Sequence, residues 1–372
     1  TGLDELVKVK NIGSKFLNPY IKYSSNGDRI HAQFHLMKTS NDGKKSGDQE
    51  EGGTESGRVA IRKPGLHNNP NGVEALNRLI CVPGMSMITA DFKSIEPMVL
   101  ASISGCQAWL ELFDYGKRNP GDPKGDLYCK IWSDIMTFIG KKMTPADVTD
   151  PMRDKAKVVV LGYTYDRSPW ALAQGLGCSV EEAKQIYKGF EQAYPEILHF
   201  SHDNRVRILV GDFPHTLFGR YRTADIVYPP TDLSELEPMN LNDLQAVLKE
   251  IEDPISGSDC HGLRALKNNV IQSAANDLNL LCKRYMAEFC PKDLWHVLAV
   301  HDSIKFVGNA SQENLTWIYE TMGDPKRWLG EKYLKALQWD KWNILRADVS
   351  YGPSNWKKSH TKFIPGKKGI LV

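Results

Sequence analysis

A row of four side chains at a spacing of four is the feature that most constrains the fold of this chain. Its members are Arg153, Lys157, Leu161 and Tyr165. Because a helical turn takes 3.6 residues, a helix would place all four along one slowly drifting face, with the two cations first. Cations suit phosphate groups and flat apolar groups suit a nucleobase. The spacing also suits a surface helix with two solvated cations, and on spacing alone this second interpretation is favoured.

The composition indicates a soluble globular protein with more than one domain or subdomain. The chain has 372 residues, of which 41% are hydrophobic and 25% are charged, ordinary values for this class. The formal net charge is only +2, so a nucleic-acid site would need local clustering of cations. The seven cysteines show no C-x-x-C spacing, which argues against structural zinc and favours reduced thiols. The sequence shows neither a signal peptide nor an apolar run near 20 residues, so we expect no membrane insertion.

Strand and helix patterns follow one another along the chain. Alternating or continuous apolar runs predict strands within residues 29–36, 79–90 and 295–308. Residues 106–215 are mainly helical in pattern, with breaks at NPGDPKG, GCS and AYP, and residues 262–289 predict one long amphipathic helix.

Two segments have the composition of peripheral structure. Residues 40–57 are polar and glycine-rich and lack large apolar side chains, which predicts a flexible loop. Residues 225–259 are acidic and interrupted by prolines, with one short helical pattern. We interpret this second segment as an insertion at the surface.

Two aspartates stand at the ends of predicted strands. Asp91 follows the strand of 79–90, and Asp302 lies in a tight turn within 295–308. Two carboxylates that converge at a sheet rim could bind two Mg²⁺ ions, which prefer oxygen ligands and can assist an in-line phosphoryl displacement. The alternatives are that Asp91 caps the following helix and that Asp302 is an ordinary turn residue.

Six segments together resemble family A DNA polymerases, the class of bacterial DNA polymerase I and many phage replicases, and the phage type is the expected one. Residues 91–96 (DFKSIE) resemble the first palm motif, 153–165 the fingers helix and 301–303 (HDS) the third motif. Three weaker matches, at 56–70, 216–220 and 264–272, resemble the minor-groove segment, the turn that closes the fingers and the palm helix near the primer end. All six occur in the order of the family.

The resemblance implies an α+β fold with the right-hand architecture of polymerases. The implied N-terminal palm portion, with a flexible loop, covers residues 1–105, and mainly helical fingers cover 106–224. An acidic insertion at 225–261 and a C-terminal palm portion at 262–372 follow. Since about 30 residues precede the first strand pattern, we expect a thumb largely absent from this chain and no exonuclease.

The implied activity is template-directed DNA synthesis by two-metal-ion nucleotidyl transfer, with release of pyrophosphate. Asp91 and Asp302 would bind the two Mg²⁺ ions, for which Mn²⁺ could substitute, and the backbone carbonyl of Phe92 would be a further ligand. Arg153 and Lys157 would hold the triphosphate, and Lys157 would protonate the departing pyrophosphate as a general acid.

The remaining implied roles concern the nucleotide and the DNA. Glu96 would be the steric gate against a ribose 2′-OH, Tyr165 would stack near the templating position, and Leu161 would pack at the sugar edge. Tyr128 would contact a phosphate oxygen through its hydroxyl. Contacts to primer-template DNA, including minor-groove acceptors common to every correct base pair, would come from Arg58, His67, Asn68, Arg264, Asn268, Gln272 and His301.

Four positions depart from the usual pattern of the family. Leu161 stands where Phe or Tyr is usual, Ser303 replaces a Glu, Tyr128 replaces a common His, and Ser94 replaces a frequent Gln. These departures concern rate, fidelity and discrimination between nucleotide analogues, because the residues that the chemistry requires are retained.

The expected partners are primer-template DNA and deoxynucleoside triphosphates. An upstream thumb or exonuclease segment, or a processivity subunit, is a further expected partner, and no membrane is expected. The expected location is the cytoplasm of a bacterial or phage-infected cell. Two alternatives stay open. A single-subunit RNA polymerase is favoured by Ser303 and opposed by Glu96. A non-catalytic DNA-binding module derived from a polymerase is opposed by the retained cations and aspartates.

Overall fold

The fold divides into two compact units, each described here by itself. The computed structural model describes residues 33–35, 60–62, 84–209, 214–221, 259–300, 303–353, 360–365 and 370–371. The sheet unit comprises Thr1–Lys93, Asn279–Met322 and Ala347–Val372, and the helical unit comprises Ser94–Leu278 and Gly323–Arg346. None of the helices in the described part of the chain is both long and apolar enough to cross a membrane.

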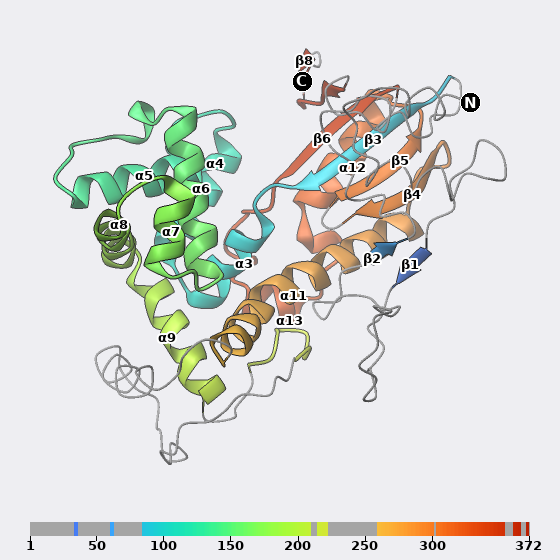
Figure 1. The fold of residues 1–372 in the computed structure, drawn as a ribbon. Helices are drawn as coiled ribbons and strands as arrows, with labels where there is room; N and C mark the ends of the chain where they lie inside the picture. The colour runs from blue at the N-terminus through green and yellow to red at the C-terminus, as the bar shows by residue number, and fades with distance from the viewer. Residues whose placement is uncertain are drawn as a thin grey trace, which may run out of the picture. The chain divides into compact units, whose positions relative to one another are not determined.

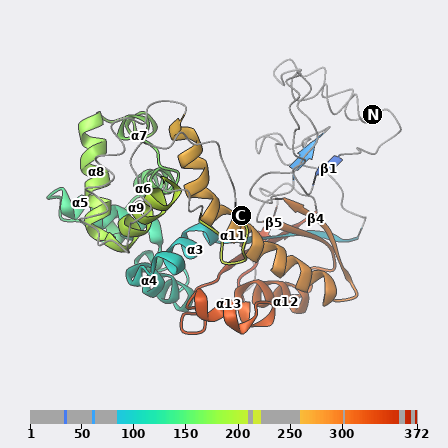
Figure 2. The same cartoon turned by 90° about the horizontal axis from the view of Figure 1, so that it is seen from below.

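The sheet unit is built on a six-stranded antiparallel sheet (Figure 1). Its strand order is β4-β5-β3-β6-β7-β8, and the strands are β3 (Ser86–Phe92), β4 (Leu294–Val300), β5 (Ser303–Gly308), β6 (Ala347–Gly352), β7 (Thr361–Lys362) and β8 (Ile370–Leu371). Two short strands, β1 (Gln33–His35) and β2 (Ala60–Arg62), form a separate antiparallel pair. The helix α12 (Gln312–Gly323) lies along the six-stranded sheet in both views (Figures 1 and 2).

The side chains of the central strand β3 alternate between the two faces of the sheet. Because side chains alternate along a strand, Ile88 and Ala90 lie on one face, and both are fully buried. Asp91 and Thr89 lie on the opposite face. Ile318 of α12 is fully buried as well.

The helical unit contains helices from three parts of the chain. Its described α-helices are α3 (Ile95–Ser104), α4 (Gln107–Arg118), α5 (Leu127–Phe138), α6 (Asp150–Thr164), α7 (Pro169–Leu176), α8 (Val180–Ala193), α9 (Pro195–Leu209), the N-terminal part of α11 (Asp259–Glu288) and α13 (Glu331–Ala336). Short 3₁₀ turns lie at Pro123–Gly125, Pro145–Asp147 and Pro325–Arg327. Helix α5 packs against α6 and α8, and α7 packs against α8.

Local sequence signals set several of these helix starts. Ser179 and Glu182 form a capping box at the start of α8. Asp126 caps α5, and Ser168 caps α7 immediately before a proline. Trp109 is fully buried between α4 and α8, where its ring meets Phe190 edge-on.

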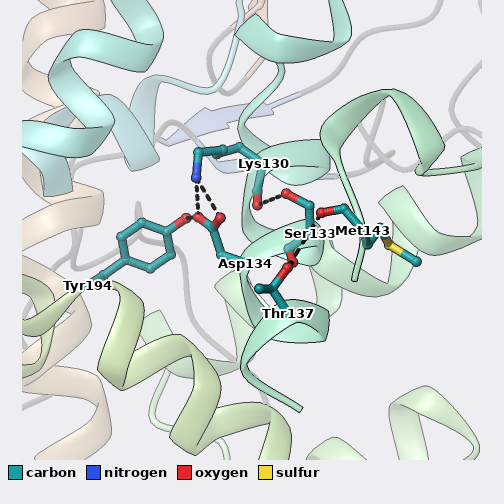
Figure 3. Close-up of polar contacts among 6 residues, drawn as sticks. All are labelled: Lys130, Ser133, Asp134, Thr137, Met143 and Tyr194. Atoms are coloured by element: carbon teal, nitrogen blue, oxygen red, sulfur yellow. Dashed lines mark hydrogen bonds and ion pairs between the residues drawn. The ribbon is translucent and has the colours of Figure 1, made fainter. Parts of the chain in front are cut away.

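A polar network joins α5 to the segment that links α8 and α9 (Figure 3). The hydroxyl of Tyr194 donates to Asp134 Oδ2 at 2.7 Å, and Lys130 Nζ contacts both oxygens of the same carboxylate at 2.5 and 2.7 Å. Burial, and then the charge of Asp134, raise the pKa of Tyr194 well above its ordinary value. The phenol therefore stays protonated and keeps donating at neutral pH.

Most of the predicted elements are present, and the α+β class is confirmed. The long helix, the two-stranded pattern near the C-terminus and the breaks near residues 119–125, 177–179 and 194 all appear. Two details differ. Residues 139–149 interrupt the helices between α5 and α6, and α6 ends at Thr164, so that Tyr165 caps the helix instead of lying within it. The predicted loop at 40–57 and nearly all of the predicted insertion at 225–261 lie outside the described residues.

Candidate active site

Asp91 occupies the middle of a polar row on the sheet. In the strand register it pairs with Ser303 of β5 on one side and with Asp348 of β6 on the other. Directly paired residues of antiparallel strands share a face, with Cβ atoms about 4.5–5.5 Å apart, so the three side chains form one row. Asp302 precedes Ser303 in the chain but lies outside the described residues.

The donors of this row suit a hard divalent cation. Asp91 and Asp348 supply carboxylate oxygens, and Ser303 Oγ is buried without a hydrogen-bond partner among the described residues. Mg²⁺ prefers oxygen ligands of this type. Asp348 is also held by Lys362, whose Nζ lies 3.4 Å from Oδ1. Within the described ranges, three or more His, Cys, Asp or Glu side chains do not gather into a metal-binding cluster, and Asp302 is not in those ranges.

The alternative role of Asp91 as a helix cap is wrong. Helix α3 begins at Ile95, and its N-cap residue is Ser94. Asp91 instead belongs to β3, which continues to Phe92. The side chain of Phe92 is 4% exposed, so its ring anchors the end of the strand in the core.

In the helical unit, the spaced row lies on the outer side of α6. Arg153 and Leu161 are half-buried and Lys157 is exposed, whereas Ala156 and Val160 are buried on the other side. The period of four therefore predicts the face of α6 correctly. Tyr165 follows directly after the last helical residue.

The Arg153 side chain contacts two residues at the start of α5: Asp126, which caps that helix, and Tyr128, which lies in its first turn. Its Nε contacts both carboxylate oxygens of Asp126 at 3.1 Å, and its Nη2 contacts Asp126 Oδ2 at 3.0 Å. The guanidinium carbon lies 5.1 Å from the ring centroid of Tyr128, a cation–π distance. Burial opposes the charge of Arg153, but Asp126 outweighs it, so the pKa of the guanidinium is raised. The pairing uses Nε and Nη2 and does not use Nη1.

Tyr128 lies underneath this guanidinium. Its side chain is buried, with 7% exposed, and burial raises the pKa of its phenol. The sequence interpretation missed Asp126. The acidic residue before a helical pattern was a signal for the cap, but nothing local indicates that it also binds Arg153.

Glu96 and Tyr165 meet within the helical unit. The phenol of Tyr165 donates to Glu96 Oε2 at 2.9 Å. Both side chains are half-buried. The hydrogen bond joins the first turn of α3 to the residue that ends α6, so two of the sequence-predicted site residues lie together.

The predicted DNA-contact residues are only partly described. Asn268 and Gln272 lie one turn apart on α11, and both are half-buried. Arg264 belongs to the same helix, but its side chain is not among those described. The other predicted contacts lie outside the described residues: Arg58, His67, Asn68 and His301.

Comparison with known proteins places these observations in one family. The family model for DNA polymerase family A matches residues 3–324. DNA polymerase I of Caldicellulosiruptor bescii is 31% identical over 175 residues, which are 46% of this chain and 19% of that protein. DNA polymerase I of Borreliella burgdorferi is 23% identical over 366 residues, which are 96% of this chain and 33% of that protein.

A solved structure shows the same fold. The POL domain of Pol1 from M. smegmatis, in complex with DNA primer-template and dNTP, matches with a TM-score of 0.64 at 20% identity, covering 91% of this chain and 50% of that one. The chain thus spans half or less of each protein compared. Because the family model matches most of its length, the chain belongs to DNA polymerase family A.

Proposed function

We propose that this chain carries out template-directed DNA synthesis, adding deoxynucleotides to a primer 3′-OH with release of pyrophosphate. The observation that carries the proposal is the placement of the family's residues. Asp91 lies in a polar row on the sheet. Arg153 and Lys157 lie on α6, and Tyr165, which ends that helix, binds Glu96 in the first turn of α3. We assign the palm to residues 1–105 and 262–372 and the fingers to residues 106–224, a stretch that falls within the helical unit.

Divalent cations fit the polar row. Asp91, Asp302 and the backbone carbonyl of Phe92 would hold two Mg²⁺ ions, with Mn²⁺ as a substitute. The bound ions supply charge stabilisation for the attacking and leaving oxygens. Ser303 takes the place of a carboxylate here, and Asp348 is the carboxylate that the strand register places beside Asp91.

The side chains of α6 act on the triphosphate. Arg153 offers Nη1 to a phosphate oxygen while Asp126 fixes its other edge. Lys157 is exposed on the same face, where it binds the phosphates and donates a proton to the pyrophosphate oxygen as that oxygen leaves. Tyr128 acts through Arg153, because its own ring is covered.

Sugar selection depends on the pair of Glu96 and Tyr165. A carboxylate held by a phenol at 2.9 Å is fixed in one position, so it can exclude a ribose 2′-OH. Leu161, one turn before Tyr165, lines the sugar edge with an aliphatic side chain. DNA contacts would come from Arg58, His67, Asn68, Arg264, Asn268, Gln272 and His301.

Primer extension with single nucleotides tests the proposal. The parent chain is incubated with primer-template DNA, Mg²⁺ and one deoxynucleotide at a time. We expect extension only with the nucleotide complementary to the template, and loss of extension when a chelator removes the metal. Extension without regard to the template, or none at all, contradicts the proposal.

Two further measurements separate the alternatives: a reaction with ribonucleotides and no primer, and the binding of primer-template DNA. Ser303 favours a single-subunit RNA polymerase, which would incorporate ribonucleotides without a primer. A non-catalytic module would bind primer-template tightly and incorporate nothing. Both outcomes differ from the primer-dependent incorporation of deoxynucleotides that we expect.

A further inference from the structure

Asp166 ends α6 in a conformation that usually belongs to glycine. Its φ is +55°. Its N–H donates to the carbonyl of Tyr163 at 3.1 Å, and the N–H of Arg167 donates to the carbonyl of Gly162 at 2.7 Å. These two hydrogen bonds make a Schellman motif, in which the residue at the left-handed position is most often glycine. An aspartate there accepts backbone strain that glycine would avoid.

The carboxylate of Asp166 binds two cations from other helices. Lys267 of α11 lies 3.1 Å from Oδ1, and Arg205 of α9 lies 3.0 Å from Oδ2. The side chain of Lys267 is only 5% exposed and that of Asp166 is 16% exposed. A buried cation needs a paired anion, so Asp166 connects the end of α6 firmly to α9 and α11. All three helical segments belong to the helical unit.

Tyr165 directly precedes Asp166 in the chain. Its N–H closes the last hydrogen bond of α6, to the carbonyl of Leu161 at 2.9 Å, and its phenol binds Glu96. Because the ion pairs of Asp166 with Arg205 and Lys267 anchor this turn to α9 and α11, they fix the direction in which the Tyr165 ring leaves the helix. A change of that direction would break the 2.9 Å contact to Glu96.

We propose that Asp166 is a positioning residue that sets the discrimination between deoxyribonucleotides and ribonucleotides. Its paired carboxylate holds Tyr165 so that the phenol keeps Glu96 in the place where it excludes a 2′-OH. The inference rests on the proposed function, because it assigns a role within the nucleotide site of the same enzyme. It explains why a charged residue occupies a position whose backbone favours glycine.

Two substitutions at Asp166 remove the charge of its side chain and keep the left-handed conformation of its backbone. Asp166→Gly keeps the left-handed turn without strain, and Asp166→Asn keeps a residue type that tolerates it; both remove the charge. We expect the ratio of kcat/KM for a deoxynucleotide to that for the matching ribonucleotide to fall about tenfold in both variants, the factor for losing one hydrogen bond to a charged group. Glu181→Gln, which removes a carboxylate from an exposed pair on α8, is the matched control and should keep the parental ratio.

A double-mutant cycle tests whether Asp166 acts through Tyr165. Tyr165→Phe alone should lower the ratio by a similar factor, and adding Asp166→Asn to it should change the ratio little further. Multiplicative effects of the two substitutions would overturn the inference, because they would show that Asp166 acts by another route.

A milder variant keeps the test decisive if the charge-free variants fold poorly. Arg205→Gln removes one of the two cations and leaves the pair with Lys267. We expect the ratio of kcat/KM for a deoxynucleotide to that for the matching ribonucleotide to fall about threefold. The effect is smaller because one of the two ion pairs of Asp166 is kept. A parental ratio in folded Arg205→Gln, or in folded Asp166→Gly, overturns the inference and leaves the proposed function standing. A parent that incorporates no deoxynucleotide overturns the proposed function itself.

Discussion

Asp126 performs two roles with one carboxylate, and substitution can separate them. Its Oδ1 accepts hydrogen bonds from the backbone N–H groups of Tyr128 and Cys129 at 3.0 and 3.1 Å, which caps α5. The same carboxylate binds Nε and Nη2 of Arg153. Asp126→Asn keeps the cap, since asparagine caps helices about as well as aspartate, and removes the charge of the pair. Asp126→Ala removes both.

The expected loss of stability follows from the exposure of the pair. The side chains of Arg153 and Asp126 are 33% and 23% exposed, which lies between a surface pair and a buried one. We therefore expect Asp126→Asn to lower the free energy of unfolding by about 1–2 kcal/mol. Asp126→Ala should lower it by about 1 kcal/mol more, the usual value of a cap. Urea unfolding of the two variants and the parent measures both steps.

The pairing should also affect nucleotide binding. Without Asp126, the Arg153 side chain must be ordered when the triphosphate binds, which costs about 0.5–1.5 kcal/mol and raises the KM for a deoxynucleotide about 2- to 10-fold. The kcat should change little, and both variants should show the same KM, because the cap has no part in this effect. A KM equal to or below that of the parent would refute the reasoning, since it would mean that Asp126 competes with phosphate for Arg153.

Three further predictions concern other parts of the chain. Leu161→Tyr should raise the incorporation of dideoxynucleotides relative to deoxynucleotides, because a phenol can replace the missing 3′-OH interaction; an unchanged ratio in a competition assay would contradict this. Burial, and then the charges of Arg205 and Lys267, lower the pKa of His202 from 6.5 to about 4, so below pH 6.5 the unfolded chain binds a proton that the folded chain does not. The free energy of unfolding should fall by about 1–2 kcal/mol as the pH drops from 6.5 towards 4, after allowance for the partial exposure of the ring, and His202→Gln should flatten this dependence in urea titrations. Gly116→Ala should lower stability by about 1–3 kcal/mol, because a methyl group would overlap the backbone carbonyl of Gly125; a parental melting temperature would show that this contact relaxes freely.

The parts of the fold that the sequence predicts are those set by local patterns. The spacing of four identifies the outer face of α6, and alternation along β3 places Asp91 opposite Ile88 and Ala90. The apolar period of residues 262–289 predicts α11 almost to its ends. In each case the burial preference repeats with the period of the element itself.

The parts that escape prediction depend on contacts between distant segments. Asp348 stands beside Asp91 only because β6 pairs with β3, and no local pattern reports that register. Arg153 reads as a solvated cation until Asp126 is placed against it. The end of α6 escapes because Asp166, where glycine would have marked a stop, is held in the left-handed conformation by contacts from α9 and α11.

The central claim is that the polar row on the sheet is the catalytic centre of a DNA polymerase. Single-nucleotide primer extension by Asp91→Ala tests this claim most directly. The matched control is Asp340→Ala, which removes an exposed carboxylate from the helical unit. We expect the control to extend the primer at the parental rate. Asp91→Ala should extend it about 1,000-fold more slowly or not at all, as expected when several kcal/mol of charge stabilisation are lost. Equal extension by Asp91→Ala and the parent would contradict the assignment of the site.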